Sequence, residues 1–262
     1  MLYISRNDIE QIAEYIIEKY KKAFVPKHHL CYNIDPVELA NLLGFRIVYA
    51  NITADGSILG QTSCSCVWTP IVGPDGDEYL FYLDGKTILV EERLLRDSKN
   101  VGRKNFTIAH ELAHQIINRE YQNMYSTPNQ VFCDYRRSAK PHKEITDWYE
   151  WQADALAAAI LLPKDALTDA MFMFGLGDKI KLLSKRYSEN RYNQFCEMAE
   201  FFQVSKTALS YRMEQLGLLE RNYLVLEAQQ KKGDAKPCQQ NKKVPQKQQC
   251  AAQHATRFLH LN

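Results

Sequence analysis

The sequence lacks a long apolar run. None of its segments approaches the roughly 20 consecutive apolar residues that a membrane-spanning helix needs, and the best candidate, residues 153–163, is too short. The first residues also lack a cationic start followed by an apolar core, so they predict no secretory signal. We therefore expect a soluble, cytoplasmic protein that does not enter a membrane.

The sequence also lacks paired cysteines. Its seven cysteines are odd in number and scattered, and none has the C-x-x-C spacing typical of zinc ribbons and thioredoxin-like sites. This distribution favours reduced thiols over a disulfide framework. With 262 residues and a hydrophobic content of 45%, the chain can bury a full core without cross-links.

Net charge is small, at +2, but it is unevenly distributed. Residues 228–262 contain seven basic residues and one acidic residue, which leaves 26 basic and 30 acidic residues in the rest of the chain. That mildly acidic body predicts no broad nucleic-acid-binding surface. The Gln- and Lys-rich tail has almost no apolar periodicity, which predicts disorder. We interpret it as a solvated extension; the alternative is a weak electrostatic tether to nucleic acid.

Hydrophobic spacing predicts two helices near the start of the chain. Apolar residues at helical spacing indicate an amphipathic helix over residues 7–24. A shorter helix is predicted to begin at Asp35-Pro36, a capping residue followed by a proline at the first helical position, and to end at Gly44.

Strand signals follow these helices. Residues 45–49, 79–83 and 87–90 alternate as strands do, and Asp84-Gly85 predicts a tight hairpin turn between the last two. From residue 101 onward helical signals dominate. The sequence therefore predicts an α+β fold with a small antiparallel sheet.

The segment 105–114 contains the spacing H-E-x-x-H. Because a helix advances 3.6 residues per turn, His110 and His114 project from one face on consecutive turns and can bind one zinc ion. Glu111 lies beside the pair, where it can remove a proton from a water at the metal as a general base. The segment therefore predicts a catalytic zinc site with Glu111 as the catalytic residue.

An alternative is that the two histidines lie on a helix surface, or are satisfied in the core, without a metal. The apolar flanks disfavour it, because little of this helix can face water. Two histidines and a glutamate on a largely buried helix need a compensating partner, which a metal provides. The flanking residues are Ile108, Leu112 and Ile116 on one face and Ala109, Ala113 and Ile117 on another.

A catalytic zinc usually has three protein ligands and an open position, so a third ligand is expected downstream of the histidines. Glu150 is preferred because it begins a helix in which it shares one face with Ala153 and Ala157, whose small side chains allow close helix packing. Asp154, one turn later, is expected to accept the other ring N–H of a ligand histidine. The candidates considered are Glu120, Asp134, His142, Glu144, Asp147 and Glu150.

Several segments together are more specific than the zinc motif alone: the N-terminal helix, residues 35–44 before a strand, residues 59–61, residues 106–114 and residues 150–163. Over roughly residues 1–220 the sequence resembles the ImmA/IrrE family of gluzincin-like metallopeptidases. The resemblance implies a zincin-like fold in which His110, His114 and Glu150 bind Zn²⁺ and Glu111 is catalytic. It also implies a substrate class, the helix-turn-helix repressors that control mobile elements or stress genes.

The sequence departs from the family pattern without losing a ligand. Asn105 stands where many relatives have Arg, Ala113 replaces a common Gly, and Leu156 replaces a common Phe. The connection from His114 to Glu150 is also long. It could be a substrate-facing insertion or an ordinary surface loop, and we favour the loop.

Residues 195–213 resemble a helix-turn-helix segment, with Ser205 capping the second helix. Lys206, Ser210 and Arg212 are expected to be exposed, where they could contact phosphates or base edges. Because similar segments follow the protease core in the resembled family, we favour a scaffold or repressor-docking role over DNA reading. The expected inner positions are Ala199, Phe202, Val204, Leu209, Met213 and Leu216.

Three parts are expected: a zincin-like metallopeptidase domain (1–165), a helical region (166–227) with the helix-turn-helix-like segment at about 193–217, and the basic tail (228–262). The preferred function is a zinc endopeptidase that cleaves a specific protein, a helix-turn-helix repressor, and direct DNA binding is disfavoured. The alternative is a metal-containing regulator or antitoxin-like module acting through the helix-turn-helix-like segment. A structural zinc site would be expected to have four protein ligands, which the sequence does not show.

Overall fold

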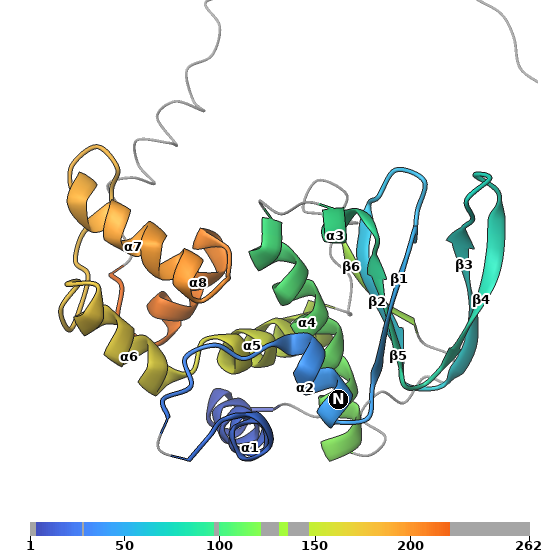
Figure 1. Ribbon diagram of the computed structural model, residues 1–262, viewed down its shortest axis with the longest axis horizontal. Coiled ribbons are helices and arrows are strands. Elements are labelled where there is room, and N and C mark those ends of the chain that lie inside the picture. Colours follow the sequence, from blue (N-terminus) through green and yellow to red (C-terminus); the bar gives the residue numbers. More distant parts are fainter. Residues whose placement is uncertain (1–3, 28, 97–99, 122–130, 136–146, 221–262) are drawn as a thin grey trace, which may run out of the picture. The chain divides into compact units, whose positions relative to one another are not determined.

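The computed structural model of the protein has an α+β fold (Figure 1). It describes residues 4–27, 29–96, 100–121, 131–135 and 147–220, all within the compact unit Met1–Asn222. The predicted tail lies outside the described residues, and the predicted boundary near residue 165 stays a prediction. In chain order the elements are α1 (Arg6–Phe24), α2 (Pro36–Leu42), β1 (Arg46–Ala50), β2 (Ile58–Ser63), β3 (Cys66–Val72), β4 (Glu78–Asp84), β5 (Thr87–Glu91), α3 (Arg93–Arg96), α4 (Val101–Glu120), β6 (Val131–Tyr135), α5 (Asp147–Leu161), α6 (Lys164–Met173), α7 (Glu189–Phe201) and α8 (Lys206–Gln215).

The first two helices are confirmed, and the second has the predicted signals at its ends. At α1, the Ser5 side chain accepts a hydrogen bond from the Asp8 N–H while the Asp8 carboxylate accepts one from the Ser5 N–H. At α2, the Asp35 carboxylate accepts hydrogen bonds from two backbone N–H groups of the first turn. Gly44 follows α2 with φ of 83°, a conformation that glycine adopts without strain. Across the described parts of the chain, every helix is too short or too polar to span a bilayer.

The main sheet has four strands in the order β1-β5-β2-β6. β1 pairs with β5 in parallel, and the other two pairings are antiparallel, so the sheet is mixed where the sequence predicted an antiparallel one. β3 and β4 form a separate antiparallel ribbon. The predicted hairpin between β4 and β5 is therefore wrong. β5 is buried along its whole length and has β1 and β2 on its two edges, so β4 pairs with β3 instead.

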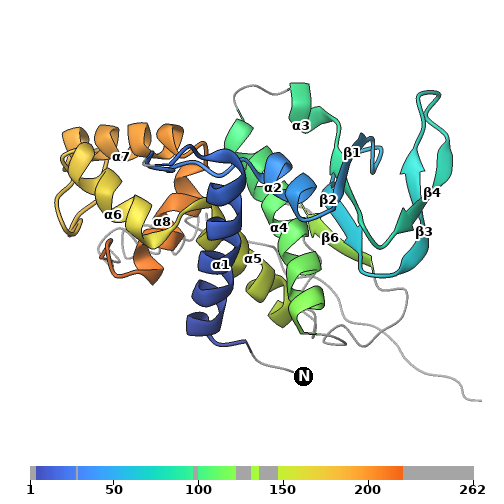
Figure 2. The same ribbon diagram turned by 60° about the horizontal axis from the view of Figure 1, so that its bottom comes forward.

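Helices pack on one face of the main sheet, and the β3-β4 ribbon packs on the other (Figure 2). α4 contacts β2, β5 and β6 on one face of the main sheet and packs along α5, which in turn contacts α1. The largest hydrophobic cluster fills this helical side. On the other face, Leu89 of β5 packs with Ile52 and with Leu83 of the ribbon in a smaller cluster. The helix that carries H-E-x-x-H therefore lies between the sheet and a second layer of helices.

β6 lies within the long connection between His114 and Glu150. It pairs with β2, and its Phe132 is buried, so the prediction of an ordinary surface loop is wrong for residues 131–135. Residues 122–130 and 136–146 of the connection lie outside the described residues. A strand of only five residues has a weak sequence pattern, so β6 becomes evident only through its pairing with β2.

α7 and α8 are two helices joined by a short turn, and they lie where the sequence predicted the helix-turn-helix-like segment. The Ser205 side chain caps α8 by accepting a hydrogen bond from the Ala208 N–H, and the predicted inner positions are buried or partly buried. Lys206 is exposed and Ser210 is half-buried. The prediction that Arg212 is exposed is wrong, because its residue exposure is 2%. The reason is a set of contacts with α1 and with the end of α5 that sequence spacing does not encode.

Candidate metal centre

The middle of α4 is enclosed by the rest of the fold. Every side chain from Thr107 to Ile117 is buried, which confirms that little of this helix faces water. On the α5 side, Ala153 and Ala157 are fully buried, and so is Ala113 of α4. These small side chains let the two helices approach each other closely. His110, Glu111 and His114 are therefore buried polar residues in a largely apolar interior.

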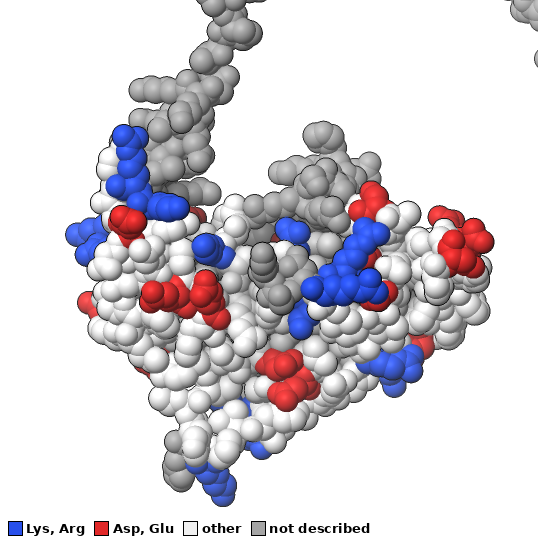
Figure 3. Space-filling model, turned by 45° about the horizontal axis from the view of Figure 1, so that its top comes forward, with Lys and Arg blue, Asp and Glu red and all other residues white. Residues whose placement is uncertain are grey.

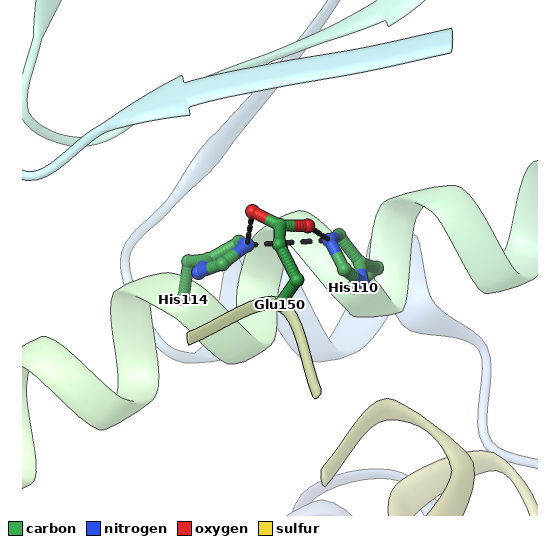
Figure 4. A group of neighbouring side chains, drawn as sticks. All are labelled: His110, His114 and Glu150. Atoms are coloured by element: carbon green, nitrogen blue, oxygen red, sulfur yellow. Dashed lines mark hydrogen bonds and ion pairs between the residues drawn. The ribbon is translucent and has the colours of Figure 1, made fainter. Parts of the chain in front are cut away.

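His110, His114 and Glu150 converge on one point (Figure 4). Both imidazoles project from α4, and the Glu150 carboxylate reaches them from α5, lying against the two ring nitrogens. His110 Nε2 is 3.2 Å from Glu150 Oε2 and 3.2 Å from His114 Nε2, and His114 Nε2 is 3.5 Å from Glu150 Oε1. Two imidazole nitrogens and a carboxylate oxygen are ligand atoms that zinc favours.

The separations between these atoms fit a tetrahedral zinc ion. With bonds of about 2.0–2.1 Å, the ligand atoms of a tetrahedral site are about 3.3–3.4 Å apart. His110 Nε2 lies 3.2 Å from His114 Nε2 and 3.2 Å from Glu150 Oε2, close to that edge length, and His114 Nε2 meets the other carboxylate oxygen, Oε1, at 3.5 Å. A cation would also offset the repulsion that arises when lone pairs of three acceptors face one another. The donor set and its dimensions therefore fit a metal with three protein ligands.

The surroundings of both histidines suit metal binding. His110 Nδ1 lies 2.9 Å from Asp154 Oδ1, so an Nδ1–H can donate to this carboxylate and leave the Nε2 lone pair facing the cluster. Complete burial, together with the charge of neighbouring His110, holds the pKa of His114 well below its usual range. A neutral imidazole is the form that binds a metal.

Two side chains hold this part of α4 in place, and neither was predicted from the sequence. The Gln115 amide donates hydrogen bonds to Thr62 Oγ1 at 2.7 Å and to the Ser63 carbonyl oxygen at 2.8 Å, which fixes α4 to β2. The Phe132 ring of β6 stacks on the His114 imidazole with centroids 4.3 Å apart. Only Gln115 had a readable signal, as a polar residue directly after His114 on an apolar helix.

Glu111 packs against the backbone of β2. A Cβ atom added at Gly60 would lie 2.8 Å from Glu111 Cγ and 2.6 Å from Thr107 Cγ2, so only glycine fits between strand and helix.

Burial raises the pKa of the nearby Cys64 thiol to about 12, and the negative charge of Glu111 contributes in the same direction. Cys64 thus stays a neutral thiol, whereas thiol ligands must be deprotonated.

Of the other candidates for the third ligand, Glu120 is the one whose side chain the structure describes. Glu120 is exposed at the end of α4. Asp134 and Asp147 lie in β6 and α5, but their side chains are outside the described part of the structure, as are His142 and Glu144 altogether. Among the described residues, the group that could hold a metal ion is His110, His114 and Glu150.

Comparison with protein-family models gives a match. The model of a peptidase family described as the IrrE N-terminal-like domain matches residues 75–214, which is more than half of the 262-residue chain. The matched range contains α4, α5 and nearly all of α8, and residues 1–74 lie outside it. A search of curated proteins finds no significant match.

Proposed function

The chain belongs to the peptidase family described as the IrrE N-terminal-like domain, and from this premise we propose that it is a zinc-dependent endopeptidase with Glu111 as its general base. Membership confirms the resemblance found in the sequence and indicates a metallopeptidase-like domain that acts on protein. The observation that carries the proposal is the convergence of ligand atoms from His110, His114 and Glu150, with Glu111 on the same turn of α4.

Each residue has a defined task in the proposed reaction. Zinc held by His110, His114 and Glu150 would polarise the scissile carbonyl and lower the pKa of the attacking water. Glu111 accepts the proton of that water and delivers it to the leaving amine. The Asp154 carboxylate accepts a hydrogen bond from the Nδ1–H of His110. This bond orients the His110 ring so that its Nε2 faces the metal position. Asp154 acts through His110 and is therefore a positioning residue.

We extend the proposal to a substrate and a compartment. The substrate is a helix-turn-helix repressor of a mobile element or stress regulon, the class that the family resemblance implies, and the protein acts in the cytoplasm. Family membership supports a protein substrate but does not distinguish one protein from another. A repressor encoded beside this protein is therefore the first substrate to test.

The rival function, a regulator that binds DNA through α7 and α8, is disfavoured by two observations. Among the described residues, the group that could hold a metal ion offers three protein ligands, whereas a structural zinc site is expected to have four. On the face shown in Figure 3, Lys and Arg side chains of the described residues form separate groups with acidic groups between them. A protein that binds the phosphate backbone of a nucleic acid does so with a continuous basic surface.

The first test is metal dependence. Protein purified without chelators or metal-affinity resin is expected to contain about one zinc per chain by elemental analysis, as a three-ligand site would hold. Chelation should abolish cleavage of the neighbouring repressor, and added zinc should restore it. A well-folded protein that takes up no metal from stoichiometric zinc would contradict the proposal.

A second test addresses the close approach of β2 to Glu111. Gly60→Ala places a methyl group 2.9 Å from Glu111 Oε1 and should displace the base, lowering the hydrolysis rate at least about tenfold. We also expect the free energy of unfolding to fall by about 1–3 kcal/mol, as in overpacked cores. Denaturant unfolding and cleavage rates measure the two effects.

Gly76→Ala is the control for this test. Gly76 has φ of 90° and no atom within 4 Å of an added Cβ, so the substitution strains the backbone without touching Glu111. It should reduce stability but keep the cleavage rate of the folded protein. Equal rates in Gly60→Ala and the wild type would show that Glu111 does not need its present position.

A further inference from the structure

α4 rests on the turn that joins α7 to α8. A Cβ atom added at Gly102 would lie 2.4 Å from the Val204 carbonyl carbon and 2.6 Å from the Ser205 nitrogen, so helix and turn touch backbone to backbone. Three residues later, Asn105 Nδ2 donates a hydrogen bond to the Gln203 carbonyl oxygen at 3.2 Å. Asn105 is buried and lies five residues before His110. The contact is therefore close to the metal-binding turns of α4.

The turn itself is held firmly. Gln203 has φ of 52°, the one positive φ among the described non-glycine residues, and its N–H donates to the Glu200 carbonyl. The Val204 N–H donates to the Ala199 carbonyl, and the Ser205 side chain caps α8. These bonds fix the orientation of the Gln203 carbonyl that Asn105 meets. A turn fixed on both sides is a stable support for α4.

The same segment also holds α5. Arg212 of α8 donates from Nε to the Leu162 carbonyl oxygen at 3.1 Å, and its two terminal nitrogens pair with the Glu10 carboxylate of α1. Leu162 directly follows α5, where the last carbonyls of a helix lack partners within the helix. A buried guanidinium thus satisfies the end of α5 and links it to α1.

We propose that the α7-turn-α8 segment is a positioning element of the metal centre and not a DNA reader. Its turn holds α4, which carries His110, and Arg212 holds α5, which carries Glu150. Because these two ligands come from different helices, their 3.2 Å separation depends on how α4 and α5 are held relative to each other. Metal sites tolerate ligand distances only within about 0.2 Å. The inference rests on the proposed function for the identity of the site.

DNA reading by this segment conflicts with the same contacts. A recognition helix reads bases with residues near its N-terminus, but here Ser205 at the start of α8 lies against Gly102. Arg212, one of the two cations expected to contact DNA, is already bonded to Leu162 and Glu10, whereas the other, Lys206, is exposed.

Asn105→Ala tests the positioning role, and the chain offers a matched control. Asn33 Nδ2 donates to the Phe201 carbonyl oxygen at 2.9 Å, the same kind of bond to the same segment, but residue 33 precedes α2 and is far in sequence from any ligand. Losing one such hydrogen bond at α4 should lower zinc affinity about five- to tenfold. Asn33→Ala should leave zinc affinity unchanged.

Two readouts separate positioning from general stability. Zinc affinity is measured by competition with a chromogenic chelator, and hydrogen exchange of residues 106–117 is measured on metal-free protein by mass spectrometry. Asn105→Ala should accelerate exchange in this range and Asn33→Ala should not. Gly102→Ala should have a larger effect, and if it does not fold, the two asparagine variants still decide the question.

The outcomes distinguish this inference from the proposed function. A wild type that binds no zinc would overturn the proposed function, while exchange in the metal-free variants would still test whether the segment holds α4. Exchange and zinc affinity in Asn105→Ala that match those of Asn33→Ala would overturn the inference. Sequence-specific DNA binding by the folded wild type would overturn it as well.

Discussion

Glu111→Gln is expected to reduce peptide-bond hydrolysis by at least about 10²–10⁴-fold, the usual contribution of a general base. The amide has the shape of the carboxylate but cannot accept the proton of the attacking water. Glu111 is fully buried and packs against Gly60 and Thr107, and the isosteric substitution preserves this packing. Single-turnover cleavage of the repressor at saturating protein concentration measures the effect on the chemical step.

Zinc content and thermal stability of Glu111→Gln should stay near those of the wild type, because Glu111 is not among the grouped ligand atoms. Glu120→Gln is a suitable control, since Glu120 is an exposed glutamate on the same helix. It should cleave at the wild-type rate. Unchanged hydrolysis in Glu111→Gln would sink the peptidase proposal and leave a metal-binding protein without this catalytic base.

Glu150→Ala is expected to lose most of the bound zinc. Structural zinc sites with four ligands bind with apparent free energies of about 10–16 kcal/mol, so one ligand accounts for roughly a 10²–10³-fold change in affinity. The Glu150 side chain is 22% exposed, so its removal should disturb the core little. Competition with a chromogenic chelator measures affinity, and circular dichroism verifies the fold.

Asp154→Ala provides the graded comparison. Asp154 contacts the distal nitrogen of His110 and not the cluster itself, so its loss should weaken zinc binding by about 10–100-fold, less than the loss of Glu150. Its side chain is 48% exposed, which makes misfolding a poor explanation for any loss.

Full zinc content in Glu150→Ala would redirect the search for the third ligand to Glu144 and His142.

The candidate site was largely predictable because most of it is local. His110, Glu111 and His114 lie within five consecutive residues, and helix periodicity alone brings the two imidazoles to one face. Glu150 was preferred for the small residues that share its helical face, and the structure brings its carboxylate to the histidines. Gly60 was noticed in the family pattern but received no role, because its task depends on which helix crosses β2.

The strand pairing was predicted less well. Asp84-Gly85 carries a turn signal, but such a signal does not state which strands pair on either side of it. β5 pairs with β1 and β2, and β4 pairs with β3, so this turn leads from the ribbon into the main sheet. Strand partners are chosen by the burial of whole faces, which involves residues far apart in the chain.

By itself, the sequence determined the helices, their caps and the chemistry grouped on α4, because these depend on residues within a few positions of one another. Only the tertiary structure decided the separation of His110 and Glu150, which are 40 positions apart, and the burial of Arg212 against Glu10, 202 positions away. Contacts at such distances depend on how complete faces pack together, and residue spacing carries no record of that packing.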